Sequence, residues 1–168
     1  IQGTAGVVLA GILAGLAHLG RPLPDERFVF LGAGAAAIGI TRLVHTAQRE
    51  AGADEATVRR STILFDTKGL VYAGRPGIED DKASVGLADE DLAALGIGPD
   101  ATPLDAIRAI RAGRLIGPTQ PPGPFPGPWL RATTTSPSRI RNRRSSFWPA
   151  LRAIFLPLMR SMNVVVRA

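Results

Sequence analysis

A short apolar segment that runs directly into a glycine-rich turn and then into a helical pattern constrains this chain more than any other feature. Residues 27–31 read Arg-Phe-Val-Phe-Leu, the nearly continuous apolar run that is typical of strands buried on both faces. The run ends in Gly32-Ala33-Gly34, and apolar residues then recur at helical spacing until about residue 51. A buried strand, a tight turn and a helix in immediate succession predict one strand–helix unit of a parallel sheet.

The rest of residues 1–117 repeats this alternation. Thr102 is expected to cap a helix that carries Pro103 at its first position and an acidic residue, Asp105, in its first turn. We expect further strands over 62–66 and 114–117, helices over 5–18, 54–60, 87–95 and 102–112, a strand extension over 70–72 and a surface loop over 73–86. These elements predict an α/β fold with a parallel sheet and helices on both faces.

The glycine-rich turn has the spacing of a dinucleotide-binding loop, Gly32-x-Gly34-x-x-Ala37. In a Rossmann-type fold the first glycine permits the turn, the second lets the backbone approach the pyrophosphate, and a small third residue lets helix and strand pack closely. The helix that begins after Gly34 would also direct free N–H groups at the phosphates. The pattern therefore predicts a cofactor site, although glycine-rich turns also occur for packing alone.

Asp66 stands at the carboxyl end of the second predicted strand. A carboxylate there can accept hydrogen bonds from the adenosine ribose and would repel a 2′-phosphate, which favours NAD over NADP. Lys68, two residues later, could neutralise that phosphate, so both cofactors stay open. Asp66 lies 34 residues after Gly32, beyond the usual spacing of about 20, because residues 52–60 form an insert. The alternative interpretation is a turn residue that caps Lys68-Gly69.

Gly117 ends the third predicted strand, where such sheets leave a crevice for the nicotinamide side of the cofactor. An ordinary glycine between strand and loop explains this position equally well. His18 and His45 each stand alone on predicted helices, so we interpret both as packing or helix-surface residues. The sequence shows no histidine–serine–acid arrangement, no phosphate-binding P-loop and no cluster with metal-ligand spacing.

Composition divides the chain after Gly117. Residues 1–117 carry 12 lysines and arginines against 14 acidic residues, whereas residues 118–168 carry eight arginines, nine prolines and no acidic residue. We therefore expect a domain over 1–117 and an irregular, Pro- and Arg-rich tail over 118–168. The arginine-rich run over 139–144 lacks the interleaved aromatic residues of a single-strand binder, so we predict no nucleic-acid partner.

Composition and length also exclude cysteine-based sites and a membrane-spanning helix. Without cysteine the chain has no disulfide framework, thiolate metal site or thiol nucleophile. The apolar stretch over residues 5–19 is too short to cross a bilayer core of about 30 Å, so it predicts a buried helix and no membrane partner. We expect a cytoplasmic protein.

Four segments resemble malic enzymes, and the resemblance covers residues 1 to about 117 in order. The start, Ile-Gln-Gly-Thr-Ala, resembles the opening of that family's nucleotide domain, and residues 30–40, Phe-Leu-Gly-Ala-Gly-Ala-Ala-Ala-Ile-Gly-Ile, resemble its cofactor loop. Residues 66–70, Asp-Thr-Lys-Gly-Leu, followed by Gly74, Arg75 and Lys82, resemble the block after its second strand. Leu115-Ile116-Gly117 resembles the strand before its second cofactor contact.

The resemblance implies the C-terminal NAD(P)-binding domain of an enzyme that oxidatively decarboxylates malate to pyruvate and carbon dioxide. In such an enzyme Mg²⁺ or Mn²⁺ polarises the keto oxygen as a Lewis acid, and the parent is expected to be a homo-oligomer. Its proton-transfer and metal-binding residues precede the segment matched here, so the chain is expected to be a fragment without catalytic or metal residues. The implied cofactor positions are Gly32, Ala33, Gly34, Ala35, Ala37, Asp66 and, more weakly, Gly117.

The resemblance fades after Gly117. The family continues with a small-residue turn and an asparagine-containing loop, whereas here prolines at 118, 121, 122 and 124 remove backbone donors. We hypothesise that the tail arises from a shift of reading frame. Two alternatives to a cofactor-binding fragment remain: an inactive, partly unfolded remnant, and the Rossmann domain of another dehydrogenase, against which the Ile-Gln-Gly-Thr-Ala opening argues.

Overall fold

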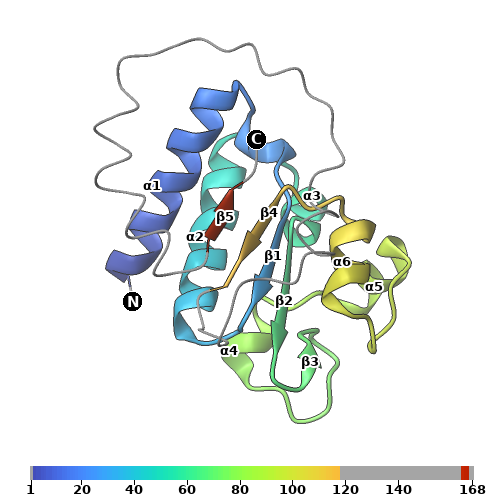
Figure 1. Cartoon of the computed structure of the whole chain (residues 1–168). Helices are drawn as coiled ribbons and strands as arrows, with labels where there is room; N and C mark the ends of the chain where they lie inside the picture. The colour runs from blue at the N-terminus through green and yellow to red at the C-terminus, as the bar shows by residue number, and fades with distance from the viewer. Residues whose placement is uncertain (1, 118–163, 167–168) are drawn as a thin grey trace.

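A five-stranded sheet forms the centre of the molecule (Figure 1). The computed structural model describes residues 2–117 and 164–166. The strands are β1 (Phe28–Leu31), β2 (Thr62–Asp66), β3 (Gly69–Leu70), β4 (Arg114–Ile116) and β5 (Val164–Val166), in the spatial order β3-β2-β1-β4-β5. β1 lies between β2 and β4 and is parallel to both, with Phe28 opposite Thr62 on one side and Arg114 on the other. The predicted parallel α/β sheet is confirmed for these three strands.

The two edge strands differ from the predicted pattern because both are antiparallel. Gly69, with φ of 109°, reverses the chain so that β3 folds back on β2 instead of extending it. Positive φ is readily available only to glycine, which explains why this residue occupies the corner. β5 lies in the segment expected to be irregular and pairs with the otherwise open edge of β4. The rest of that segment, with its arginine-rich run, lies outside the described residues.

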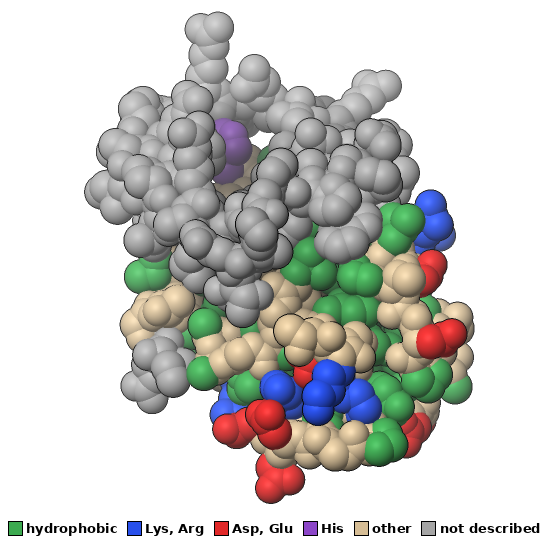
Figure 2. Space-filling model, turned by 60° about the horizontal axis from the view of Figure 1, so that its bottom comes forward, with side chains coloured by type: hydrophobic (Ala, Val, Ile, Leu, Met, Phe, Trp, Pro, Cys, Tyr) green, Lys and Arg blue, Asp and Glu red, His purple; other side chains and the backbone are tan. Residues whose placement is uncertain are grey.

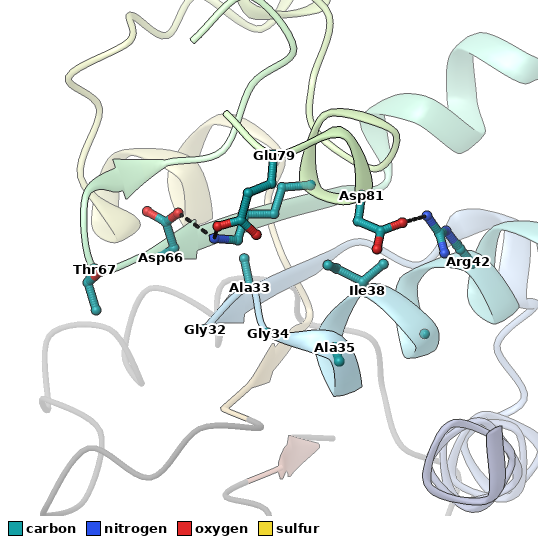
Figure 3. Close-up of a pocket in the computed structure, with 12 residues that line it drawn as sticks. Gly32, Ala33, Gly34, Ala35, Ile38, Arg42, Asp66, Thr67, Glu79 and Asp81 are labelled. Carbon is teal, nitrogen blue, oxygen red and sulfur yellow. Dashed lines mark hydrogen bonds and ion pairs between the residues drawn. The ribbon is translucent and has the colours of Figure 1, made fainter. Parts of the chain in front are cut away.

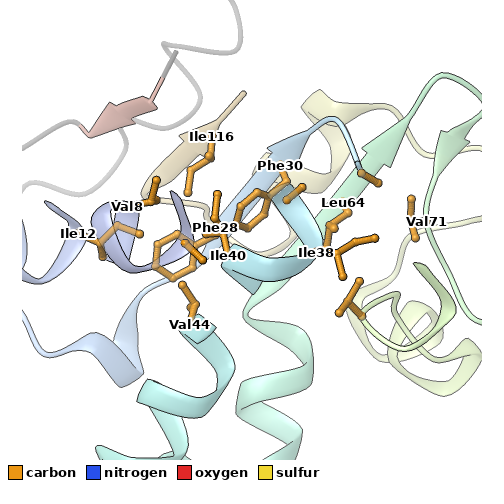
Figure 4. Close-up of a cluster of buried hydrophobic side chains, with 14 of the residues drawn as sticks. Val8, Ile12, Phe28, Phe30, Ile38, Ile40, Val44, Leu64, Val71 and Ile116 are labelled. Atoms are coloured by element: carbon orange, nitrogen blue, oxygen red, sulfur yellow. The ribbon is translucent and has the colours of Figure 1, made fainter. Parts of the chain in front are cut away.

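Helices cover both faces of the sheet. They are α1 (Gln2–Leu19), α2 (Ala35–Glu50), α3 (Glu55–Arg60), α4 (Asp80–Ala83), α5 (Asp89–Leu95) and α6 (Pro103–Ala109), with a 3₁₀ turn at Leu23–Asp25. On one face, α1 and α2 pack on Phe28, Phe30 and Ile116 (Figure 4). On the other face, α5 and α6 pack on Val29, Ile63 and Leu115. Alternate strand residues point to opposite faces. Each central strand therefore presents apolar side chains to both helical layers, as expected for buried parallel strands.

Local capping places the helices where the sequence predicts them. The Asp54 carboxylate accepts a hydrogen bond from the Thr57 N–H at 2.9 Å and starts α3. Thr102 and Asp105 form a reciprocal capping box around Pro103, which starts α6. Such caps satisfy N–H groups that have no partner inside the helix. The predicted loop over 73–86 contains one short helix, α4, which the sequence analysis missed.

The first helix is buried on one side only. Ala5, Val8, Ile12 and Leu16 lie in the core, whereas Val7 and Leu13 are 39% and 43% exposed. Within residues 2–117 and 164–166, no helix is both long enough and apolar enough to cross a membrane.

Candidate functional site

A pocket of about 530 Å³ opens at the carboxyl ends of β1 and β2, between the start of α2 and the segment that carries α4 (Figure 3). Parallel sheets bind ligands at this edge. Its lining comes from the β1–α2 turn and α2 (Gly32, Ala33, Gly34, Ala35, Ile38, Gly39, Arg42), from the end of β2 (Asp66, Thr67) and from the α4 segment (Glu79, Asp81, Lys82). Figure 2 shows lysine and arginine side chains gathered on this face, with acidic side chains beside them.

The two glycines of the turn have different reasons for being glycine. Gly32 has φ of 115°, and its N–H donates to the Phe65 carbonyl at 2.8 Å, which ties the end of β1 to β2. This conformation is strained for any residue with a Cβ. Gly34 has φ of −81°, which any residue adopts, and within the described chain no atom beyond its neighbours lies within 4 Å of the position of an added Cβ. The fold therefore requires glycine at 32 but not at 34.

The start of α2 is left without a side-chain cap. Gly34 is its N-cap and offers no side chain, and the first hydrogen bond of the helix runs from the Ile38 N–H to the Gly34 carbonyl at 3.0 Å. Helix geometry leaves the N–H groups of residues 35–37 without acceptors inside the helix. They add to the positive end of the dipole of a 16-residue helix, so this wall of the pocket attracts an anion.

The Asp66 carboxylate lines the same pocket and is held by two cations. Arg75 donates from both terminal nitrogens, at 2.6 and 3.0 Å, and Lys82 Nζ lies 3.6 Å away. The main-chain N–H of Lys68 donates to the same carboxylate at 2.9 Å. The pKa of Asp66 lies below its usual value, chiefly because of the Arg75 hydrogen bonds, while partial burial opposes the shift. Asp66 is therefore an ionised acceptor whose charge is balanced by its neighbours.

The α4 segment forms the opposite wall. Arg42 Nη2, from α2, donates to Asp81 Oδ1 at 2.8 Å and to Ser84 Oγ at 2.9 Å. Lys82 is paired with Glu79 at 3.2 Å as well as with Asp66. Two successive residues of α4 thus form salt bridges in different directions, Asp81 with Arg42 of α2 and Lys82 with Asp66 of β2.

The structure brings together most of the predicted cofactor residues. Gly32, Ala33, Gly34, Ala35 and Asp66 all line the pocket. Ala37 is fully buried in the core behind the turn, and Gly117 is buried beyond the end of β4, so neither belongs to the lining. From the sequence, Lys68 is the cation expected to neutralise a 2′-phosphate near Asp66. In the structure the side chains that pair with Asp66 are those of Arg75 and Lys82, and Lys68 contributes its main-chain N–H.

The remaining candidates lie away from the pocket. His45 Nε2 is 2.7 Å from Thr62 Oγ1 between α2 and β2, and burial lowers its pKa to about 4, so it is a neutral packing residue near pH 7. His18 is exposed at the end of α1. In the described part of the chain, no group of three or more histidine, cysteine or acidic residues is arranged to hold a metal ion.

Comparison with known families agrees with the α/β fold. A family model described as the NAD binding domain of malic enzyme matches residues 1–140. The chain belongs to the malic enzyme family. It is 42% identical over 82 residues to the NADP-dependent malic enzyme of Mus musculus, and 37% identical over 119 residues to that of Phaseolus vulgaris. A crystal structure of Entamoeba histolytica malic enzyme matches with a TM-score of 0.58 and 28% identity, over 78% of this chain and 25% of that one.

The chain corresponds to only a part of these malic enzymes. The matches cover 49% and 70% of this chain but 14% and 19% of the mouse and bean proteins. The matched part is the NAD(P)-binding domain, with a Rossmann-like α/β fold. The corner at Gly34 fits the cofactor of such a domain because it combines an open approach to the backbone with free helical N–H groups.

Proposed function

We propose that this malic enzyme domain binds its dinucleotide with the pyrophosphate against the start of α2 and the adenosine ribose against Asp66. The observation that carries the proposal is Gly34, the N-cap of α2, which the fold does not need as glycine: its φ is −81°, and no described atom beyond its neighbours lies within 4 Å of an added Cβ. A bound pyrophosphate explains that choice, because a side chain there would displace its oxygens. The ionised Asp66 supplies an acceptor for the ribose hydroxyls.

The cofactor accepted by this pocket is proposed to be NADP as well as NAD, with NADP bound more tightly. The preference for NAD in the sequence analysis depended on repulsion between Asp66 and a 2′-phosphate. In the structure Arg75 and Lys82 balance that charge. Lys82 also lines the pocket, which supports a pairing of its ammonium group with the added phosphate. The mouse and bean proteins are themselves named NADP-dependent.

Titration of the complete 168-residue chain with each cofactor tests both statements. Gly34→Asp should weaken NAD and NADP alike by at least about 100-fold, because it places bulk and negative charge at the pyrophosphate position. Gly6→Asp is the matched control, since Gly6 is exposed on α1 and an added Cβ there is equally free of contacts. Unchanged affinity in Gly34→Asp would refute the proposed site.

Thermal unfolding with and without NADP separates a cofactor-binding domain from a partly unfolded remnant. A ligand that binds only the folded state raises Tm in a concentration-dependent way. We expect a rise for the wild-type chain and none for Gly34→Asp. A chain without a cooperative transition at any cofactor concentration would favour the remnant.

The chemistry of the whole enzyme is proposed only for a longer protein. There the domain would present the nicotinamide to malate bound with Mg²⁺ or Mn²⁺ by residues outside this chain. We expect the purified chain with malate, Mn²⁺ and NADP to give no absorbance increase at the wavelength of the reduced cofactor, and turnover would refute this. Homo-oligomerisation of the parent and a cytoplasmic location stay predictions; similar proteins include a human one named as mitochondrial.

A further inference from the structure

The helical turn that carries Lys82 has little of its own to hold it in place. α4 spans four residues, Asp80–Ala83, and none of them is buried. It therefore lacks the apolar stripe that normally docks a helix on a core. The orientation of Lys82 must then depend on the chain at either side of α4 and on polar contacts made by the turn itself.

One guanidinium nitrogen supplies the polar contacts that reach α4 from another helix. Arg42 Nη2 donates both to Asp81 Oδ1 and to the hydroxyl of Ser84, the C-cap of α4. The Ser84 hydroxyl in turn donates to the Asp81 carbonyl at 2.7 Å. In Figure 3 the Asp81 side chain points toward Arg42 and away from Asp66. The clasp, defined as Arg42, Asp81 and Ser84, thus joins α2 to the turn.

Asp81 and Lys82 are successive residues, so helix geometry separates their directions by about 100°. When Asp81 is held toward α2, Lys82 is turned toward β2, where its Nζ lies 3.6 Å from Asp66. We propose that Arg42 is a positioning residue, which fixes the rotation of α4 and thereby places Lys82 for the 2′-phosphate. The inference rests on the proposed function and adds a residue on α2 to the determinants of cofactor choice.

The expected effect is modest because the clasp is exposed. The Arg42 and Asp81 side chains are 53% and 76% exposed, and such ion pairs are weak in water. Arg42→Met should therefore raise the Kd for NADP by roughly two- to fivefold. The Kd for NAD should stay unchanged, because NAD lacks the phosphate that Lys82 would contact. Arg42→Lys, which can still donate to Asp81, should restore part of the loss.

A matched control and a double-mutant cycle test whether Arg42 positions Lys82, contacts the phosphate itself or has a general structural role. Arg49→Met removes an exposed arginine from the same helix, where it pairs with Glu55 at 2.6 Å outside the pocket, and should change neither Kd. In a Lys82→Met background, Arg42→Met should have no further effect on NADP binding. A persistent effect would mean that Arg42 meets the phosphate itself, and an equal loss of NAD and NADP would mean a general structural role; both overturn the inference.

Hydrogen exchange gives a readout that needs no cofactor. The Ala83 and Ser84 N–H groups donate to the carbonyls of Glu79 and Asp80, each at 2.9 Å. Arg42→Met should speed exchange at these two amides while those in the middle of α2 stay protected. Unchanged exchange at Ala83 and Ser84 would overturn the inference.

The same experiments distinguish the failure of this inference from that of the proposed function. If Lys82→Met weakens NADP binding but Arg42→Met does not, the phosphate site stands and the clasp has no part in it. If Lys82→Met leaves NADP binding unchanged, the proposed role of Lys82 fails and the inference fails with it.

Discussion

The Asp66 carboxylate and the Arg75 guanidinium lie face to face, joined by hydrogen bonds of 2.6 and 3.0 Å, with side chains only 10% and 12% exposed. A bidentate pair of this kind is both strong and directional. Arg75 also donates to the Leu70 carbonyl at 3.0 Å, so it ties the β3 hairpin to the carboxylate. Arg75 is not part of the pocket lining, whereas Asp66 is. Arg75 therefore affects the pocket indirectly, because it balances the charge and fixes the position of Asp66.

Removal of Arg75 should therefore change both stability and cofactor choice. Arg75→Met leaves Asp66 partly buried with only Lys82 near its charge, which should lower the free energy of unfolding by about 1–3 kcal/mol. The uncompensated carboxylate should also lower the affinity for NADP relative to NAD. Urea unfolding and cofactor titration measure the two effects. Arg108→Met, at an exposed position on α6, is the control, and an unchanged NADP/NAD affinity ratio in Arg75→Met would contradict the argument.

The two glycines of the turn should respond in opposite ways to alanine. Gly32→Ala forces a Cβ into a φ of 115°, so it should lower the free energy of unfolding by about 1–3 kcal/mol. Gly34→Ala should change stability by less than about 0.5 kcal/mol, since its backbone is ordinary and its Cβ is free of contacts, yet weaken cofactor binding. Urea unfolding and NADP titration separate them. Similar loss of stability in both variants would show that Gly34 serves the fold instead.

His45 should make stability depend on pH in mildly acidic solution. Its pKa is about 4 in the folded protein, against 6.5 for an unperturbed histidine, because burial disfavours the charged ring. The unfolded chain thus binds the proton more readily than the folded one. The contribution of the neutral His45 ring to the free energy of unfolding is therefore complete above pH 6.5 and is lost progressively as the pH falls toward 4.

The loss over that window is of the order of 1–3 kcal/mol, since the ring is partly exposed. His45→Gln should flatten the dependence between pH 6.5 and 4, as followed by urea unfolding at successive pH values. If the stability of the His45→Gln variant fell with pH as steeply as that of the wild type, His45 would be excluded as the source of the pH dependence.

Two neighbouring residues on α1 should differ sharply in their contribution to stability. Ile12 is 1% exposed in the core, whereas Leu13 is 43% exposed. Ile12→Ala should lower the free energy of unfolding by about 2–4 kcal/mol, because it removes packed methyl groups and leaves a cavity. Leu13→Ala should lower it by less than about 1 kcal/mol. Comparable losses would mean that the outer face of α1 is covered in solution.

The sequence by itself determined the central strands, the long second helix and the glycine corner between them. These features follow from local rules: apolar runs for buried strands, helical spacing of apolar residues, and the need for glycine at a positive φ. Asp66 could also be placed, because the end of a parallel strand lies at the binding edge of its sheet.

Only the tertiary structure decided which groups surround Asp66. Arg75 and Lys82, which contact its carboxylate, follow it by 9 and 16 residues in a segment without a periodic pattern. Arg42, which reaches the same segment through Asp81, precedes Asp66 by 24 residues on α2. Their meeting depends on the reversal at Gly69 and on α4, a helix of one turn without a buried residue. Local patterns record which face of an element is apolar, but the positions of long charged side chains depend on contacts between elements that sequence spacing does not encode.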